Sequence, residues 1–211
     1  MPGSSPKTAK RASVESHPLL VVISGPSGVG KDALLDVLKS RGRPYHFAIT
    51  ATTRPRRGAE MDSRDYYFVS LDRFEEMAAT GELLEHALVY GHRYGVPKGP
   101  VRQALASGRE VLMRTDVQGA ATIKGAVPQA LTIFLAPASP ADLEERLRRR
   151  ATDAQETVRV RLATARREMD AAGHFDYVVV NAEGRLEEAA DQVERIIASE
   201  RARPERSAPV L

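Results

Sequence analysis

The sequence of 211 residues contains no cysteine and no tryptophan. Without cysteine there can be no disulfide, no thiolate zinc site and no thiol nucleophile. The longest apolar run, Leu19 to Ile23, is too short to cross a bilayer, and the polar first 17 residues lack the apolar segment of a secretory signal. Charge is nearly balanced, with 31 Lys and Arg against 28 Asp and Glu. We therefore expect a soluble cytoplasmic protein that binds neither membranes nor nucleic acid.

Short apolar runs alternate with helical patterns along most of the chain. We expect strands at 19–23, 111–113, 131–135 and 177–180, and helices at 31–40, 117–124, 140–150, 155–172 and 185–203. Such alternation predicts an α/β protein in which a central parallel sheet is flanked by helices on both faces.

Two segments interrupt this alternation and two segments flank it. Residues 50–100 are short, mixed, polar and aromatic pieces, which indicates an inserted lobe, and the Arg-rich stretch within 139–161 indicates a mobile lid. The core is then 18–49, 101–138 and 162–203. We expect residues 1–17 and 204–211 to be disordered tails, because they are rich in Ser, Pro and charge.

A glycine-rich loop lies between the first predicted strand and the first predicted helix. The eight residues Gly25, Pro26, Ser27, Gly28, Val29, Gly30, Lys31 and Asp32 fit G-x-x-x-x-G-K, the P-loop pattern. In such a loop, inward-facing backbone N–H groups and a helix N-terminus bind phosphate, while Lys31 adds a charge for the outer phosphates. A ligand-free βα turn is the alternative. Asp32 departs from the usual Ser or Thr, but its carboxylate is also a suitable Mg²⁺ ligand.

A second cationic patch follows in the inserted lobe. Arg54, Arg56 and Arg57 surround Pro55, and tyrosines that can donate to a phosphate lie nearby. Taken alone, a solvated basic loop and ordinary packing of the tyrosines would explain the same pattern.

The ordered set of motifs resembles the guanylate kinase family from about residue 19 to residue 201. The motifs are GPSGVGK, TTRPRR…E…DYYFVS, GELLEHALVYGHRYG, DVQG, LEERLRRRATD…RVRL and FDYVVVN. The resemblance implies a P-loop NTPase core with an inserted GMP-binding lobe and an Arg-rich lid. It also implies transfer of the γ-phosphoryl of ATP to GMP, with Mg²⁺ accompanying ATP.

The resemblance also assigns residues to each substrate. The residues that match the family's GMP phosphate contacts are Arg54, Arg57, Tyr66 and Tyr94, and those that match its guanine contacts are Thr50, Glu85 and Asp116. ATP would be bound by the P-loop residues 25–32 and, more weakly indicated, by Asn181. A carboxylate suits guanine because N1–H and N2–H₂ form a donor pair that adenine lacks.

Three arginines match the family's lid residues that clamp the ATP phosphates and the transferring group. Arg146 and Arg150 are four residues apart, so one helix face would carry both, and Arg161 lies on the next helical stretch. With Lys31 these would be the catalytic residues. A solvated, salt-bridged helix face is the alternative explanation for this charge run.

Four positions depart from the family pattern. Asp32 replaces Ser or Thr, Arg114 replaces an acid, Val96 replaces a Ser or Thr that contacts guanine, and Ser63 replaces a Gly. We hypothesise that the carboxylate lost at 114 is regained at 32, and that Arg114 pairs with Asp32. Val96 predicts a somewhat weaker GMP site.

Two other functions are compatible with the same scaffold. One is a kinase for another small phosphate acceptor, against which Thr50, Glu85 and Asp116 argue. The other is a non-catalytic guanylate-kinase-like domain that binds a phosphopeptide, against which the retained Lys31 and lid arginines argue. ATP and GMP are the expected partners of a monomer or homodimer.

Overall fold

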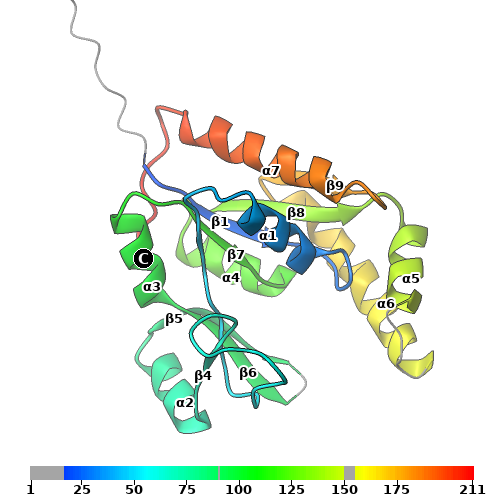
Figure 1. Ribbon diagram of the computed structural model, residues 1–211, viewed down its shortest axis with the longest axis horizontal. Helices are drawn as coiled ribbons and strands as arrows, with labels where there is room; N and C mark the ends of the chain where they lie inside the picture. The colour runs from blue at the N-terminus through cyan, green and yellow to red at the C-terminus, as the bar shows by residue number, and fades with distance from the viewer. Residues whose placement is uncertain (1–16, 90, 150–154) are drawn as a thin grey trace, which may run out of the picture.

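The structure is a computed structural model that describes residues 17–89, 91–149 and 155–211, and for 149 and 155–161 the backbone alone. The central sheet has five strands in the order β2-β7-β1-β8-β9 (Figure 1). Their bounds are β1 Leu20–Ser24, β2 His46–Phe47, β7 Val111–Arg114, β8 Leu131–Pro137 and β9 Tyr177–Asn181. All pairings between them are parallel, which confirms the predicted fold class.

Helices cover both faces of this sheet because the central strands are apolar on both sides. Val21 and Ile23 belong to the same buried cluster as the apolar faces of α1 (Lys31–Ser40) and α7 (Leu186–Arg201). Leu20 and Val22 alternate with them and pack with α3 (Lys98–Ala106) and α4 (Val117–Ala126) on the opposite face. The alternation of side chains along a strand therefore divides the core into two layers.

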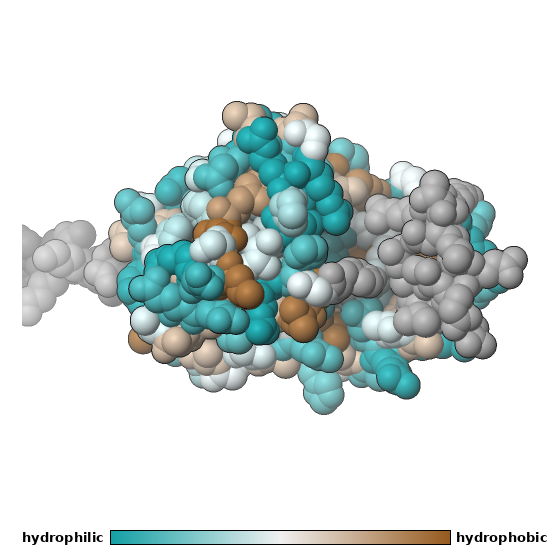
Figure 2. Space-filling view, turned by 90° about the horizontal axis from the view of Figure 1, so that it is seen from below, coloured by the Kyte–Doolittle hydropathy of each residue, from teal (hydrophilic) through white to brown (hydrophobic). Residues whose placement is uncertain are grey.

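The inserted lobe has its own small sheet, in the order β4-β3-β6-β5. It comprises β3 Ala51–Thr52, β4 Tyr67–Phe68, β5 Leu83–Val89 and β6 His92–Pro97, with α2 (Leu71–Ala79) packed through Phe74 and Met77. Seen from below the view of Figure 1, on the side of the inserted lobe, the molecule presents mostly hydrophilic side chains with small scattered hydrophobic patches (Figure 2). Such a face suits a polar ligand better than an apolar one.

The segment beyond β8 contains α5 (Pro140–Arg149) and α6 (Gln155–Asp170), followed by the 3₁₀ turn η1 (Ala171–His174). These helices lie to one side of the sheet, away from the inserted lobe (Figure 1). Arg150 lies outside the described residues. In the described parts of the chain, none of the helices is long and apolar enough to span a membrane.

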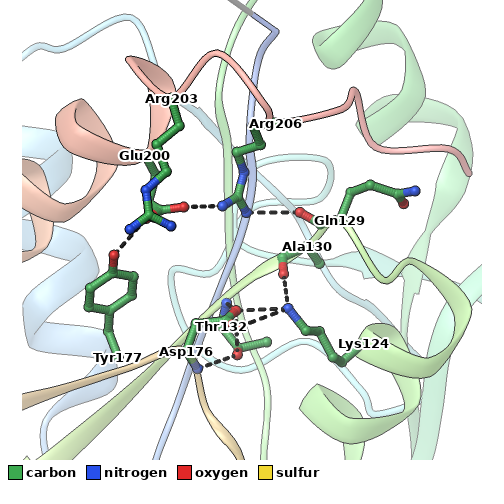
Figure 3. A network of polar contacts seen from close by, with 9 residues as sticks. All are labelled: Lys124, Gln129, Ala130, Thr132, Asp176, Tyr177, Glu200, Arg203 and Arg206. Carbon is green, nitrogen blue, oxygen red and sulfur yellow. Dashed lines mark hydrogen bonds and ion pairs between the residues drawn. The ribbon is translucent and has the colours of Figure 1, made fainter.

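Residues 204–211 differ from the predicted free tail, because they contact the core. Arg206 pairs with the buried Glu200 and donates from Nη2 to the carbonyl of Gln129 at 2.9 Å (Figure 3). Leu211 packs against the α3–α4 side of the core, and its carbonyl accepts from Arg102 at 3.0 Å. The polar composition indicated disorder, but the segment contacts the core at both Arg206 and Leu211.

Candidate active site

The phosphate loop connects β1 to α1 in a conformation that requires glycine at its first position. Gly25 has a φ of 143°, and a Cβ there would lie 2.2 Å from the carbonyl oxygen of Leu135 in the neighbouring strand β8. No side chain can be accommodated at that distance from backbone. The loop therefore lies at the carboxyl end of the parallel sheet, where α/β proteins bind their ligands.

Lys31 is the first residue of α1 and turns back onto the loop. Its Nζ donates to the carbonyls of Gly25 at 2.5 Å and Pro26 at 3.1 Å. Burial lowers the pKa of Lys31, while the negative charges of Glu168 and Asp32 act in the opposite direction. The ammonium group lies at the loop, where the negative charge of a bound phosphate would compensate for the lost hydration and favour the charged lysine.

Two predicted ATP-site residues hold the outer side of this loop. The buried Asn181, at the end of β9, donates from Nδ2 to the carbonyl of Val29 at 2.8 Å. Arg146 donates to the same carbonyl at 3.2 Å and to the Asn181 carbonyl at 2.7 Å, and its Nε pairs with Glu183 at 3.2 Å. A cavity of about 300 Å³ lies between them, lined also by Gly28 and Gly30.

In the inserted lobe, the cationic patch is organised by a carboxylate. Arg54 is 5% exposed and donates to both oxygens of Glu60, at 3.0 and 2.8 Å. Glu60 also accepts from the backbone N–H of Arg57 at 2.8 Å. The carboxylate of Glu60 raises the pKa of Arg54 and the guanidinium lowers the pKa of Glu60, so both remain charged.

The rings beside Arg54 complete this patch. The Arg54 guanidinium lies 5.1 Å from the ring centroid of Tyr66 and 5.8 Å from that of Phe68. Tyr66 and Tyr94 meet edge to face with centroids 6.3 Å apart. The aromatic rings thus keep a buried cation and two phenol groups within one cluster.

Arg114 joins this cluster to the phosphate-loop side of the molecule. Its Nε lies 2.5 Å from Oδ1 of Asp32, which confirms the pairing predicted from the sequence. Its Nη2 lies 3.3 Å from the hydroxyl of Tyr66, as donor to that oxygen. Asp32, Arg114 and Tyr66 also line a single cavity of about 560 Å³, together with Thr50 and Glu60. Residues from α1, from β7 and from the inserted lobe therefore line one cleft.

Two carboxylates face one another where the lobe meets the core. Glu85 on β5 is 9% exposed, and burial together with the charge of Asp116 raises its pKa to about 7. Asp116 follows β7 and caps α4, accepting from the N–H of Gly119 at 2.7 Å. A Cβ on Gly119 would lie 3.1 Å from Glu85 Oε2, so the helix start and the Glu85 carboxylate are in close contact.

The family model for guanylate kinase matches residues 17–200. The chain belongs to the guanylate kinase family. It is 47% identical over 89% of its length to guanylate kinase 2, chloroplastic/mitochondrial, from Oryza sativa subsp. japonica, of which the match covers 66%. It is 47% identical to the guanylate kinase of Gloeobacter violaceus, with 87% of this chain and 90% of the relative covered. The crystal structure of a guanylate kinase from Anaplasma phagocytophilum shares the fold, with a TM-score of 0.71, 31% identity and coverage of 93% and 92%.

Family membership confirms the predicted enzyme class. The described residues that were predicted for the site form three groups: the phosphate loop with Asn181 and Arg146, Arg54 with Tyr66 and Tyr94, and Glu85 with Asp116. Arg57 is an exception, since its side chain is exposed and only its backbone joins the Glu60 contact. Arg161 lies on α6 where only the backbone is described, and Arg150 is outside the description. Asp116 has a structural role as a helix cap in addition to its predicted one.

Two of the departures from the guanylate kinase pattern have visible consequences. Ser63, which replaces a glycine, has a φ of 62°, the left-handed conformation in which glycine carries no penalty. Val96 is 2% exposed and packs in the core beneath the lobe, so it offers the cleft no hydroxyl.

Sequence reasoning missed two acidic residues of this guanylate kinase. Glu60 orders the phosphate-site arginine, and its spacing of six from Arg54 gave no periodic signal. Glu168 on α6 accepts from the N–H of Ser27 in the phosphate loop at 2.9 Å. Ser27 and Glu168 are 141 positions apart in the sequence, so no local pattern could have connected them.

Proposed function

We propose that the chain transfers the γ-phosphoryl group of ATP to GMP, giving ADP and GDP. One observation carries the proposal. Arg114 contacts Asp32, next to the phosphate-loop lysine, and Tyr66, in the arginine–tyrosine cluster. A donor triphosphate at the loop and an acceptor monophosphate at the cluster would therefore meet in one cleft, as direct transfer requires.

The donor would bind through the phosphate loop and its lysine. The cavity of about 300 Å³ beside Gly28, Arg146 and Asn181 lies next to the loop and is suitable for the adenosine part. Because Asn181 and Arg146 already hold the loop through the Val29 carbonyl, we assign them first to loop geometry and second to nucleotide contact.

The acceptor phosphate would bind at Arg54, Tyr66 and Tyr94, with Arg57 turning in from its exposed position. Glu60 now occupies the Arg54 fork, so it would share that guanidinium with the incoming phosphate. Arg54 has five N–H donors, which is enough for both partners.

The base would be selected by Glu85, with Asp116 and Thr50 as further contacts. An ionised Glu85 can accept from both N1–H and N2–H₂ of guanine, and the donor pair would draw the carboxyl toward its charged form. Adenine would leave the buried carboxylate without a partner, which is a strong basis for rejection.

A magnesium ion fits this donor site only as a partner of the nucleotide. Among the described residues, no three acidic or histidine side chains gather into a cation site. Asp32, next to Lys31, carries the carboxylate expected at this site; it is 67% exposed and shares one oxygen with Arg114. Magnesium in kinases is typically bound by one or two carboxylates, substrate phosphates and water, so Asp32 would hold it directly or through water. When bound, the ion would neutralise charge that develops on the phosphates.

Phosphoryl transfer of this type depends on positioning and charge stabilisation and needs no general base. Lys31 would neutralise the donor's outer phosphates, and Arg146, Arg150 and Arg161 would surround the transferring group. Arg114 would place a further positive charge between the two sites.

An assay of ADP release across GMP, AMP, CMP and UMP, with ATP and Mg²⁺, tests the proposal directly. We expect turnover with GMP and little with the others. Glu85→Gln should raise the KM for GMP by about 100-fold, since a carboxylate with two charge-assisted bonds becomes a neutral amide. Glu82→Gln, just before β5 and with its side chain 43% exposed, is the matched control and should leave the KM unchanged. Turnover of another monophosphate in preference to GMP would identify a different acceptor, and no turnover with any would favour a binding domain.

We further propose that the enzyme works in the cytoplasm in purine nucleotide metabolism, recycling GMP, as a monomer or homodimer. The expected substrates ATP and GMP support the metabolic part of this proposal.

A further inference from the structure

The side chain of Glu168, a residue of α6, contacts the phosphate loop although the two are far apart in the sequence. Its Oε2 accepts from the backbone N–H of Ser27 at 2.9 Å. Ser27 stands between Gly25 and Gly28, in the middle of the loop, and is itself exposed. In the part of the chain that the structure describes, no other side-chain carboxylate accepts from an N–H of residues 25–32.

The chemistry of this contact resembles that of the loop's expected ligand. Loops of this type bind phosphate because their N–H groups point at the anion, and a helix N-terminus adds positive potential. A carboxylate is also an oxyanion and makes the same charge-assisted hydrogen bond. The negative charge of Glu168 also acts on Lys31, whose ammonium group lies at the same loop. Glu168 thus faces both positive elements of the donor site.

We propose that Glu168 is a further residue of the donor site, an internal anion that occupies part of the phosphate cradle until the donor's phosphates displace it. This rests on the proposed function only in taking the loop as the donor site. The Ser27 N–H cannot serve both oxyanions in the same geometry, and two anions at one cradle repel each other. Binding of the polyphosphate therefore includes the free energy of removing Glu168.

The displacement costs every anion the same free energy, so it matters most for anions that bind weakly. An isolated phosphate would gain only a few N–H contacts, which do little more than replace those of Glu168. A polyphosphate spans the loop and reaches Lys31 as well, so its additional contacts outweigh the loss. Glu168 therefore raises the concentration that every anion needs, so weakly bound small anions leave the cradle empty at concentrations at which polyphosphates still bind.

Titration calorimetry with sodium tripolyphosphate tests this without any phosphoryl transfer. Glu168→Gln keeps the shape of the side chain but removes its charge, and should bind tripolyphosphate about tenfold more tightly. Inorganic phosphate should gain by about the same factor, because each anion must displace Glu168 at the same cost. Adenosine, which has no phosphate and is measured by competition with ADP, should bind as to the unchanged chain. Asp170→Asn is the matched control, because it removes an exposed acid from the same helix.

Each possible result decides the proposal. Equal or weaker binding of tripolyphosphate by Glu168→Gln would overturn it, and would assign to Glu168 the structural role of holding the loop. An equal gain for adenosine, or an equal gain in Asp170→Asn, would also overturn it, because the effect would then not be competition at the cradle. Glu168→Ala, checked for folding by its melting curve, should show at least the same gain. ATP:GMP transfer is measured separately, so loss of the proposed function would not alter these binding results.

Discussion

The pairing of Asp32 with Arg114 leads to a double-mutant cycle on activity. Asp32→Ser restores the hydroxyl that the family carries, but leaves the Arg114 charge unpaired beside Tyr66. Arg114→Asp restores the family's acid, but places two carboxylates next to the donor phosphates. The double variant recreates the family's combination, so we expect it to recover much of what each single change loses.

The size of the coupling follows from the geometry. Two unit charges about 4 Å apart interact by about 1 kcal/mol in water and about 4 kcal/mol at an effective dielectric constant of about 20. The side chains of Arg114 and Asp32 are 37% and 67% exposed, which favours the lower figure. We expect each single change to lower kcat/KM by about tenfold, and the cycle to give a coupling free energy of about 1–2 kcal/mol.

The measurement is kcat/KM for GMP at saturating ATP and Mg²⁺, from coupled ADP release, for the four proteins of the cycle. A parallel cycle on the exposed pair Arg73–Glu82, 2.8 Å apart and remote from the phosphate loop, serves as control and should leave kcat/KM unchanged. Additivity of the two site changes within about 0.5 kcal/mol would refute the coupling. The pair would then be a surface contact with no part in catalysis.

Three further predictions follow from single residues. Because burial raises the pKa of Glu85 to about 7 and guanine needs its ionised form, the KM for GMP should rise as pH falls below about 7, by up to about tenfold per unit, and level off above about 8. Glu85→Gln should lose this pH dependence, whereas a slope that persists in the variant would exclude Glu85 as its source. Ser63→Gly should raise the free energy of unfolding by about 0.5–1 kcal/mol in urea denaturation, since Ser63 has a φ of 62°; a loss of stability would contradict this. Glu200→Gln should lower the melting temperature by about 6 °C without changing either KM, because Glu200 is 1% exposed between Tyr177, Arg203 and Arg206. An unchanged melting temperature would show that the Glu200 contacts drawn in Figure 3 do not stabilise the fold.

Local patterns determined much of this protein. The apolar run at 19–23, the glycine-rich loop and the helical periodicity after it specify strand, phosphate loop and helix through contacts within a few residues, and these elements lie where the sequence predicts them. The arginine–tyrosine patch and Glu85 were identified by their motifs. The pairing of Asp32 with Arg114 could also be predicted, because two departures from one pattern compensated each other in charge.

Only the tertiary structure decided which distant groups meet. The contact of Arg114 with Tyr66 depends on how the inserted lobe is set against β7, and the contact of Glu168 with Ser27 depends on how α6 returns to the loop. The anchoring of residues 204–211 likewise depends on a buried carboxylate on α7. Charged side chains at the surface of a predicted helix carry no periodic signal of their partners. Their partners are determined when parallel strands bring loops from separate parts of the chain to one edge of the sheet.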